Sequence, residues 1–433
     1  MKRQFEAIVV GAGPAGAAAA LIMAKGGVDV ALLERGNFPG EKNMFGGMLH
    51  KMPSLEEHFD EYWNQAPLER HVSKKATIFM TDDAHVNVCM DWEDFDKPPY
   101  NGYTVFRPRW DNWLAQEAVK AGATLINRCT VTDLIVKNGK VVGVQTLRDN
   151  GEIYAPVVVS AEGVLSFLAD KMGMRKKFNP AKMAVGCKCL IDMPKQMIDD
   201  RFGLVRDQGV AYEYVGVSMG VRGGVALYTN RDSVSVNMVC HIGSLGKSGI
   251  TLYDMMNNYL EQPQMKKLLN GGRLSEYSAH AIPEGGYEMI PQLVADGFLI
   301  TGDAAAFCNA TGINLEGINM ATHSGILAGK AVIAAKQNND YSKGSLDLYR
   351  KLIEDSYVYK DLKTFKRAPG LLHDDRIFQK YPDFALDMIK KIYHITGEPK
   401  KNMTMLVLDH VFNNGKVSIM DLISTVWTAW RAL

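Results

Sequence analysis

The sequence predicts an α/β fold: a discontinuous dinucleotide-binding domain on a parallel sheet, an inserted α+β domain with an antiparallel sheet, and a helical C-terminal region. The first observation is a strand, a glycine-rich turn, a helix and a second strand within the first 35 residues. The second is a series of alternating runs between 167 and 291, typical of an antiparallel sheet with one covered face. The third is the helical spacing of apolar residues beyond 340.

Length and composition are those of an ordinary globular protein. The 433 residues fit two to three domains, at roughly 150 residues per domain. Hydrophobic residues make up 47% and charged residues 22%, which excludes collagenous, disordered and low-complexity classes. Because 49 basic residues nearly balance 48 acidic ones, no global basic field favours nucleic acid as a partner.

The cysteines and the apolar segments indicate the expected cellular location of the protein. Six cysteines stand far apart, and the chain opens on charged residues instead of an apolar leader. We therefore expect reduced thiols and a cytoplasmic location. Nowhere do about 18 apolar residues follow one another, the length that a membrane-spanning helix needs. Any membrane contact is expected to be peripheral, on the inner face.

A dinucleotide-binding pattern occupies the first 35 residues. The turn Gly11-Ala12-Gly13-Pro14-Ala15-Gly16 lies between an apolar strand and a helix. Gly11 permits the tight turn, Gly13 lets the backbone approach a pyrophosphate, and Gly16 lets helix and strand pack closely. Glu34, at the end of the second strand, is expected to bind the ribose hydroxyls. The alternative is a glycine-rich turn with a structural role only.

A second segment favours a flavin over a nicotinamide cofactor. The strand at 297–301 runs into Gly302-Asp303, whose carboxylate can accept a hydrogen bond from a ribityl hydroxyl. A helix follows, and its start would direct N–H groups at the flavin edge. The alternative for Asp303 is a helix cap. The residues expected at the flavin edge are Gly312, Ile313 and Asn314.

Further strands and helices complete the cofactor domain. Residues 103–111 precede a helix predicted at 113–121, strands are predicted at 123–126 and 131–136, and Asn138-Gly139 predicts a hairpin turn. A buried strand at 157–159 ends in small residues. Together with the first motif, these segments resemble the FAD-binding domain of glutathione-reductase-like flavoproteins of the para-hydroxybenzoate-hydroxylase type. The resemblance implies that FAD lies against Arg109, Val131, Ala161 and Gly163.

Three parts of the sequence point to one family among these flavoproteins. They are Glu34-Arg35-Gly36 together with residues 40–49, residues 276–286, and Gly302-Asp303. They resemble the electron-transfer-flavoprotein:quinone oxidoreductase family, in particular its FixC-type members. This sequence differs from the family pattern at residues 305–310, where the family has more glycine. Geranylgeranyl reductases share the FAD motifs but carry a cysteine motif where this chain has Met44-Phe45. The additional FAD residues that the resemblance implies are Arg35, Asn43, Gly46 and Gly47.

The family resemblance also implies partners. These are the subunits of an electron-transfer flavoprotein, a separate ferredoxin-like iron–sulfur subunit, and a quinone as a further acceptor. Relatives that carry their own cluster bind it through cysteines near the C-terminus. Here the last cysteine is Cys308, and the final 125 residues contain none. A four-iron cluster ordinarily needs four thiolates, so we expect this chain to borrow its cluster from the partner.

The predicted domain boundaries follow these segments. The FAD domain comprises 1–80, 104–166 and 292–340. The antiparallel-sheet domain, on the substrate or quinone side, comprises 81–103 and 167–291. The helical region is 341–433.

The sequence predicts no catalytic acid, base or nucleophile, and no cluster of histidines that suggests a metal site. Cys187 and Cys189 form a C-x-C pair, which favours packing over a redox disulfide. His280 and Glu284 have either a structural or a direct role. The glycine-rich run 214–224 predicts a plain hairpin at a sheet edge, or a loop that contacts quinone or lipid.

The last helix, predicted at 418–433, is amphipathic. One stripe is apolar, and the opposite face is polar. The stripe either packs on the core or docks a partner or a membrane interface, for which paired tryptophans are suited. The apolar stripe comprises Ile419, Leu422, Ile423, Val426, Trp427 and Trp430, and the polar face comprises Asp421, Ser424, Thr425, Thr428 and Arg431.

The sequence therefore predicts an FAD-dependent electron-transfer oxidoreductase. Electrons would come from an electron-transfer flavoprotein and leave toward a ferredoxin-like partner, a quinone, or both. One alternative is a geranylgeranyl-reductase-like enzyme that reduces a prenyl-lipid double bond. The other is a non-catalytic scaffold subunit with a structural FAD.

Overall fold

The computed structural model describes residues 3–43, 47–175, 179–312, 314–414 and 417–433. The chain forms two compact units. The first comprises 1–69, 105–179 and 281–366, and the second comprises 70–104, 180–280 and 367–433. The helices before residue 367 therefore belong to the first unit and those after it to the second. The sequence had predicted a single helical region at 341–433. The predicted domain boundaries stay a proposal.

The first unit is built on a mostly parallel sheet, which is the predicted cofactor-binding architecture. Its strand order is β17-β18-β11-β1-β2-β7, and every neighbouring pair is parallel except β17 with β18. The central strand β1 is buried at every position, as expected for a sheet covered on both faces. The strands are β1 (Ala7–Val10), β2 (Val30–Leu33), β7 (Thr124–Ile126), β11 (Val158–Ser160), β17 (Val294–Ala295) and β18 (Phe298–Ile300).

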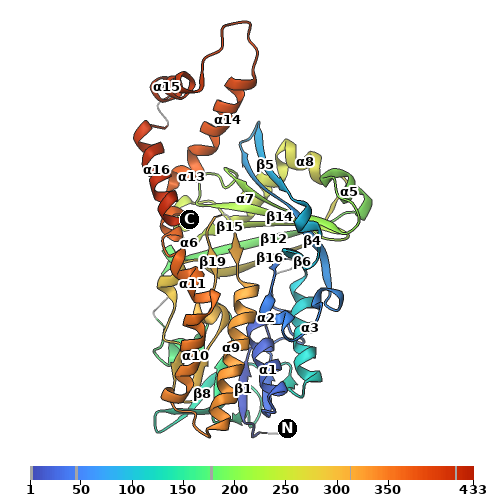
Figure 1. Cartoon of the computed structure of the whole chain (residues 1–433), viewed down its shortest axis with the longest axis vertical. Coiled ribbons are helices and arrows are strands. Elements are labelled where there is room, and N and C mark those ends of the chain that lie inside the picture. The colour runs from blue at the N-terminus through green and yellow to red at the C-terminus, as the bar shows by residue number, and fades with distance from the viewer. Residues whose placement is uncertain (1–2, 44–46, 176–178, 313, 415–416) are drawn as a thin grey trace. The chain divides into compact units, whose positions relative to one another are not determined.

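Helices α1 (Pro14–Lys25) and α9 (Ile318–Gln337) pack side by side in this unit (Figure 1). Small residues permit the close approach. A Cβ at Gly325 would lie 2.0 Å from the carbonyl oxygen of Ala15, and a Cβ at Gly329 would lie 2.7 Å from Cβ of Ile22. The small-residue pattern of α9 is therefore the surface on which α1 rests.

Smaller elements complete the first unit. The turn at Asn138-Gly139 joins two paired strands, as predicted, and both residues have positive φ. The remaining strands are β3 (Met48–His50), β8 (Val131–Lys137), β9 (Lys140–Thr146), β10 (Glu152–Tyr154), β19 (Asn309–Ala310) and β20 (Leu315–Glu316). The helices are α2 (Pro53–Glu56), α3 (Arg107–Lys120), α4 (Phe167–Lys171), α10 (Lys343–Asp355) and α11 (Tyr357–Thr364), with short 3-10 helices at Tyr62–Asn64, Gly286–Met289 and Gly302–Ala305.

The second unit contains the larger sheet, with the order β16-β12-β15-β14-β13-β4-β6 and β5 paired to β4. Strand β15 is antiparallel to β12 and to β14, β14 is antiparallel to β13, and β5 is antiparallel to β4, whereas β13 and β4 run parallel. One face buries an apolar core that includes both Cys187 and Cys189, which confirms their predicted packing role. The strands are β4 (Leu68–Met80), β5 (His85–Asp91), β6 (Gly102–Val105), β12 (Met183–Asp192), β13 (Gln208–Val215), β14 (Gly223–Thr229), β15 (Ser233–His241) and β16 (Arg273–Pro283).

The helices of the second unit include the last segment of the chain, drawn in red in Figure 1. They are α5 (Lys195–Phe202), α6 (Ile242–Ser248), α7 (Leu252–Glu261), α8 (Pro263–Leu269), α12 (Ala368–Leu371), α13 (Asp375–Gln379), α14 (Tyr381–Tyr393), α15 (Met403–Asn414) and α16 (Ile419–Ala432), with short 3-10 helices at Glu93–Asp96 and Pro180–Lys182.

Two helix boundaries differ from the sequence prediction. Helix α3 begins at Arg107 instead of Trp113, because Pro108 occupies the first turn, where no intrahelical N–H bond is needed. The helical stretch that the sequence predicts beyond 340 begins with two separate helices, α10 and α11. Ser356 between them has an extended backbone, with φ −80° and ψ 163°.

The glycine-rich run between β13 and β14 is a connection between two interior strands, not a sheet edge. Val217 and Val221 are buried in the core of the second unit, at 2% and 1% exposure. These two valines therefore serve packing, whereas Met219 between them is 46% exposed. Across the described residues, no helix is long and apolar enough to cross a membrane.

Candidate FAD site

Four of the predicted cofactor segments lie at one edge of the parallel sheet, because each follows the carboxyl end of a strand. Neighbouring strand ends are joined by backbone hydrogen bonds. The amide of Gly11 donates to Leu33, that of Ala161 to Val10, and that of Thr301 to Ser160, at 2.8 to 3.0 Å. Ligands of open α/β sheets bind at this edge. The segments gathered here are the turn at 11–16 after β1, Glu34 after β2, 161–163 after β11 and Gly302-Asp303 after β18.

The three glycines of the first turn have different surroundings. Gly11 has φ +97°, and a Cβ there would lie 2.4 Å from the carbonyl oxygen of Ala161. At Gly16 a Cβ would lie 1.8 Å from the carbonyl oxygen of Gly11, so helix and turn are in direct contact. At Gly13 a Cβ would meet no atom within 4 Å. Open space therefore lies beside Gly13, where the sequence predicted the pyrophosphate.

Pro14 and Ala15 form the first turn of α1, and no described side chain caps it. Its N–H groups and its dipole favour an anion at this position. Glu34 is buried at 7% exposure. Its carboxylate accepts hydrogen bonds from the amides of Ala12, at 3.2 Å, and Gly36, at 2.7 Å. The carboxylate thus lies beside the same turn.

The turn that carries Asp303 is held by α9. The hydroxyl of Ser324 accepts hydrogen bonds from the hydroxyl of Thr301, at 2.9 Å, and from the amide of Gly302, at 3.2 Å. Burial raises the pKa of Asp303, while Arg107 and Arg175 oppose that rise. Two cations therefore act on the carboxylate that was predicted to bind the ribityl chain.

Arg107 and Arg175 were not among the predicted site residues. Arg107 forms a two-point ion pair with Asp111, at 2.9 Å for each bond, and Asp111 also accepts a hydrogen bond from Asn43. Arg175 donates to the carbonyl oxygen of Val164 at 2.7 Å. The i,i+4 spacing of Arg107 and Asp111 at a helix start was the signal available in the sequence.

Arg109, the arginine that the sequence analysis assigned to the FAD site, has other surroundings than Arg107. Its side chain is 66% exposed and pairs with the buried Glu69 at 3.1 Å. The two arginines are two positions apart on α3 and so point in different directions. The structure thus brings Arg107, rather than Arg109, into the electrostatic neighbourhood of Asp303.

The remaining predicted residues have varied surroundings. Gly163 has φ +71° after β11, and Glu162 beside it accepts from the hydroxyl of Ser160 at 2.7 Å. The carbonyl of Gly47 accepts from the amide of Val105 at 3.0 Å. Arg35 and Gly312 are exposed, Ala161 is buried, and Val131 and Asn314 are partly buried, while Gly46 and Ile313 lie outside the described residues.

These residues fit FAD. The turn offers N–H groups beside open space for a pyrophosphate, a buried acid for ribose hydroxyls, and a second acid, Asp303, for a ribityl hydroxyl. In the described part of the chain, no three His, Cys, Asp or Glu side chains are grouped so as to hold a metal ion.

Two protein families match the chain. Residues 6–172 match the FAD dependent oxidoreductase family, and residues 368–433 match the ETF-QO/FixC family C-terminal domain, where ETF-QO is electron-transfer-flavoprotein:quinone oxidoreductase.

Relatives match nearly the whole chain. The probable electron transfer flavoprotein-quinone oxidoreductase YdiS of Escherichia coli is 38% identical over 418 residues, covering 96% of this chain and 97% of that protein. Protein FixC of Escherichia coli is 38% identical over 420 residues, covering 97% and 96%. A geranylgeranyl bacteriochlorophyll reductase-like protein of Thermoplasma acidophilum shares the fold, with a TM-score of 0.73 at 19% identity over 98% of this chain and 100% of that one. The chain is therefore an FAD-dependent oxidoreductase of the FixC and electron-transfer-flavoprotein:quinone oxidoreductase family.

Proposed function

We propose that this protein accepts electrons from a reduced electron-transfer flavoprotein and relays them through FAD to a ferredoxin-like iron–sulfur subunit, a quinone, or both. The observation that carries this proposal is the similarity to FixC and YdiS along nearly the full chain. The description of YdiS as a probable electron transfer flavoprotein-quinone oxidoreductase names both the proposed donor and a quinone as acceptor.

We propose that the predicted site residues hold FAD, with Arg107 and Arg175 added to them. The start of α1 binds the pyrophosphate, Glu34 the ribose, and Asp303 the ribityl chain. Bound FAD supplies the ability to take up and release electrons. The chain's own residues supply position and charge, because Ser324 fixes the Gly302 turn and two arginines offset the charge of Asp303.

We propose that the relay uses a partner that carries an iron–sulfur cluster. Cys129, Cys187, Cys189, Cys240 and Cys308 are buried, and Cys89 is exposed. We propose that a separate ferredoxin-like subunit supplies the iron–sulfur cluster and docks on the helical C-terminal region.

We also propose a peripheral contact with the inner face of the membrane. The exposed apolar stripe of α16 supports it, with Trp427 and Trp430 at 62% and 83% exposure. A high-salt or mild-detergent wash should release the protein from membranes. Release only under conditions that dissolve the bilayer, with no embedded partner present, would contradict this.

The function is tested by anaerobic titration of the FAD-loaded protein with reduced electron-transfer flavoprotein. We expect the flavin absorbance to fall in proportion to the donor added. It should recover on addition of a soluble quinone or an oxidised ferredoxin-like subunit. Flavin that stays oxidised under a reduced partner complex would instead indicate a scaffold role. Turnover of a prenyl lipid by dithionite-reduced protein would indicate a double-bond reductase.

A further inference from the structure

Strand β5 lies exposed at an edge of the larger sheet (Figure 1). In the part of the chain that the structure describes, β4 is its only strand neighbour. Every residue from His85 to Asp91 is exposed except Val86, which is partly buried. Because a strand directs its N–H and C=O groups alternately to its two sides, half of those of β5 have no strand to pair with.

Strand β5 lacks the features that protect the edges of sheets. Lysine, proline and bulges are the usual protection. Residues 85–91 contain no lysine or proline, and the ladder with β4 runs without a register shift. Strand β8 is a matched contrast, because it also has 7 residues and lies at the edge of the three-stranded sheet. Its ladder shifts register twice, and it ends at Lys137. Of these two edges, β5 is thus the one that another strand can join.

The two faces of β5 differ in chemistry, because successive side chains of a strand point to opposite faces. One face carries Val86, Val88 and Met90, and the last two are 57% and 39% exposed. Val88 pairs with Thr77 of β4, which is not part of the apolar core of this unit. A strand that covers this edge must therefore match an apolar face and a polar one. The polar face carries His85, Asn87, Cys89 and Asp91.

We propose that β5 is the surface through which two copies of this chain form a dimer, by antiparallel pairing of β5 with β5. Such a pair of identical strands has a two-fold axis, and residues 85–91 overlap over their full length when this axis passes Val88. Val88 then faces Val88 of the second copy, Val86 faces Met90, and His85 faces Asp91. The inference does not depend on the FAD site or on the proposed electron relay.

This register makes β5 complementary to itself, which is why a second copy fits the edge. On one face, apolar side chains meet across the two strands. On the other face, the imidazole of His85 meets the carboxylate of Asp91, and the two-fold axis repeats this pair. Lys74 contacts Oδ2 of Asp91 at 3.3 Å, and the carboxylate has a second oxygen, Oδ1, for the imidazole.

The segments on either side limit the ladder to β5. Before the strand, the chain reverses at Thr81, whose amide donates to the carbonyl oxygen of Ala84 at 2.9 Å. After it, a 3-10 helix begins at Glu93. The acids that flank the strand lie outside the paired residues, and Lys97 lies 3.8 Å from both Glu93 and Asp94. The pairing therefore places no acid of β5 opposite another acid.

The first test is the mass of the full-length, FAD-loaded protein, measured by light scattering over a dilution series. We expect a dimer. Val88→Lys would place two like charges opposite each other, and we expect it to raise the dissociation constant by at least about tenfold. Val136→Lys, at a valine of β8 that is 48% exposed, is the matched control and should dimerise as the wild type does. A monomeric wild type would overturn the proposal, and so would a dimer that Val88→Lys leaves intact.

Cross-linking tests the register and does not depend on how well Val88→Lys folds. In a Cys89→Ser background, Val88→Cys should form a disulfide between two copies on mild oxidation. Residues directly opposite each other in an antiparallel pair have Cα atoms about 4.5–5.5 Å apart, within the range of a disulfide. Met90→Cys, which would face Val86 of the second copy, should not cross-link. Equal cross-linking of the two variants, or none in Val88→Cys, would overturn the proposal.

Discussion

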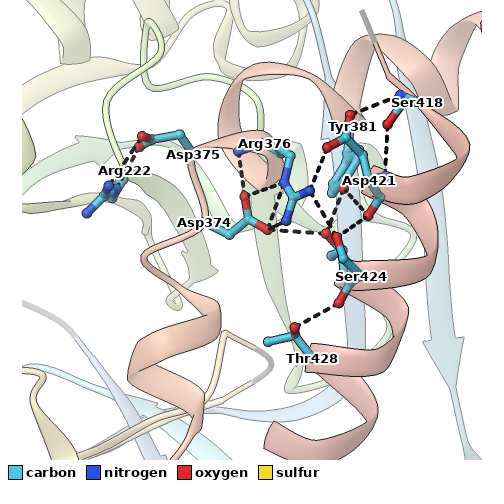
Figure 2. A network of polar contacts seen from close by, with 10 residues as sticks. Arg222, Asp374, Asp375, Arg376, Tyr381, Ser418, Asp421, Ser424 and Thr428 are labelled. Atoms are coloured by element: carbon cyan, nitrogen blue, oxygen red, sulfur yellow. Dashed lines mark hydrogen bonds and ion pairs between the residues drawn. The ribbon is translucent and has the colours of Figure 1, made fainter.

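Helices α9 and α16 both carry a sequence pattern that predicts a helix, yet they attach to the protein in opposite ways. Helix α9 is held by close packing, since Gly325 and Gly329 let α1 approach its backbone. Helix α16 is held by its polar face, and its apolar stripe is exposed except at Leu422, which is partly buried. Arg376 donates to Asp421 at 2.7 Å and to Ser424 at 3.0 Å, and Tyr381 bonds to Thr425 at 2.7 Å (Figure 2).

Of the two alternatives that the sequence left open for the stripe of α16, packing on the core is therefore wrong for most of its residues. Val426 is 68% exposed and Trp430 is 83% exposed. The periodicity of apolar residues predicts that a helix forms and that it has two faces. It does not say which face the rest of the chain covers, because hydrogen bonds of the polar face can supply the attachment.

The largest effect is expected from breaking the close packing of α9. Gly325→Ala would place a Cβ 2.0 Å from the carbonyl oxygen of Ala15, so α1 must move. We expect the free energy of unfolding to fall by about 3 kcal/mol. The matched control is Gly344→Ala in α10, where the nearest atom, the Ser342 hydroxyl oxygen, lies 3.8 Å away.

Gly344→Ala should be neutral or stabilising by roughly 0.5–1 kcal/mol, because alanine favours helix. Denaturant unfolding followed by circular dichroism measures both variants. Equal stability of the two variants would show that α1 and α9 do not depend on the glycine contact.

A smaller and local effect is expected at α16. Arg376→Ala removes the side chain that joins α13 to Asp421 of α16 and that also pairs with Asp374, at the start of α13. We expect a loss on the order of 1–2 kcal/mol, confined to the C-terminal helices. Hydrogen exchange of the α16 amides should speed up in this variant. Arg431→Ala, on the same helix beside Trp427, should leave the exchange unchanged, and faster exchange in both would refute the assignment.

Helices α9 and α16 should also differ in their sensitivity to acid. Hydrogen bonds from Ser418 and Arg376 lower the pKa of Asp421 to about 2, from 3.8. A carboxyl with a lowered pKa stabilises the folded state above its unfolded value, and this stabilisation is lost as the pH falls from about 3.8 through about 2. Over this range the α16 amides should lose protection before those of α9. Simultaneous loss would contradict the distinction.

The smallest effect on folding is expected from the exposed tryptophans. Replacing Trp427 and Trp430 together by Ser should change the free energy of unfolding by no more than about 0.5 kcal/mol, because both side chains are already solvated. Thermal unfolding of the isolated protein measures this. A marked loss of stability would mean that the stripe is part of the core after all.

The parts of the fold that depend on local sequence signals were predictable, and those that depend on distant chain connections were not. The strand, turn and helix around Gly11 were predicted because each local signal agrees with the tertiary structure. The parallel pairing of β13 with β4 was not, because strand direction within a mixed sheet depends on chain connections that alternation does not encode.

The predicted backbone segments meet at one sheet edge, whereas the predicted Arg109 pairs with Glu69 and it is Arg107 that acts on Asp303. Glycines and the Gly-Asp pair mark strand ends, which meet at one sheet edge by topology. Arg107 was missed in favour of Arg109, because a shift of two positions on α3 changes the direction of a side chain. The helix was expected to begin only at Trp113, so the sequence did not place either arginine on a helical turn.

The central claim, that FAD binds at the Gly11–Gly16 turn, is tested most directly by the flavin content of Gly13→Trp. Because a Cβ at Gly13 meets no atom within 4 Å, the bulky side chain should fill the space of the pyrophosphate without disturbing the fold. We predict a protein with the circular dichroism and unfolding temperature of the wild type, but colourless. A folded Gly13→Trp protein with full yellow FAD occupancy would contradict the account.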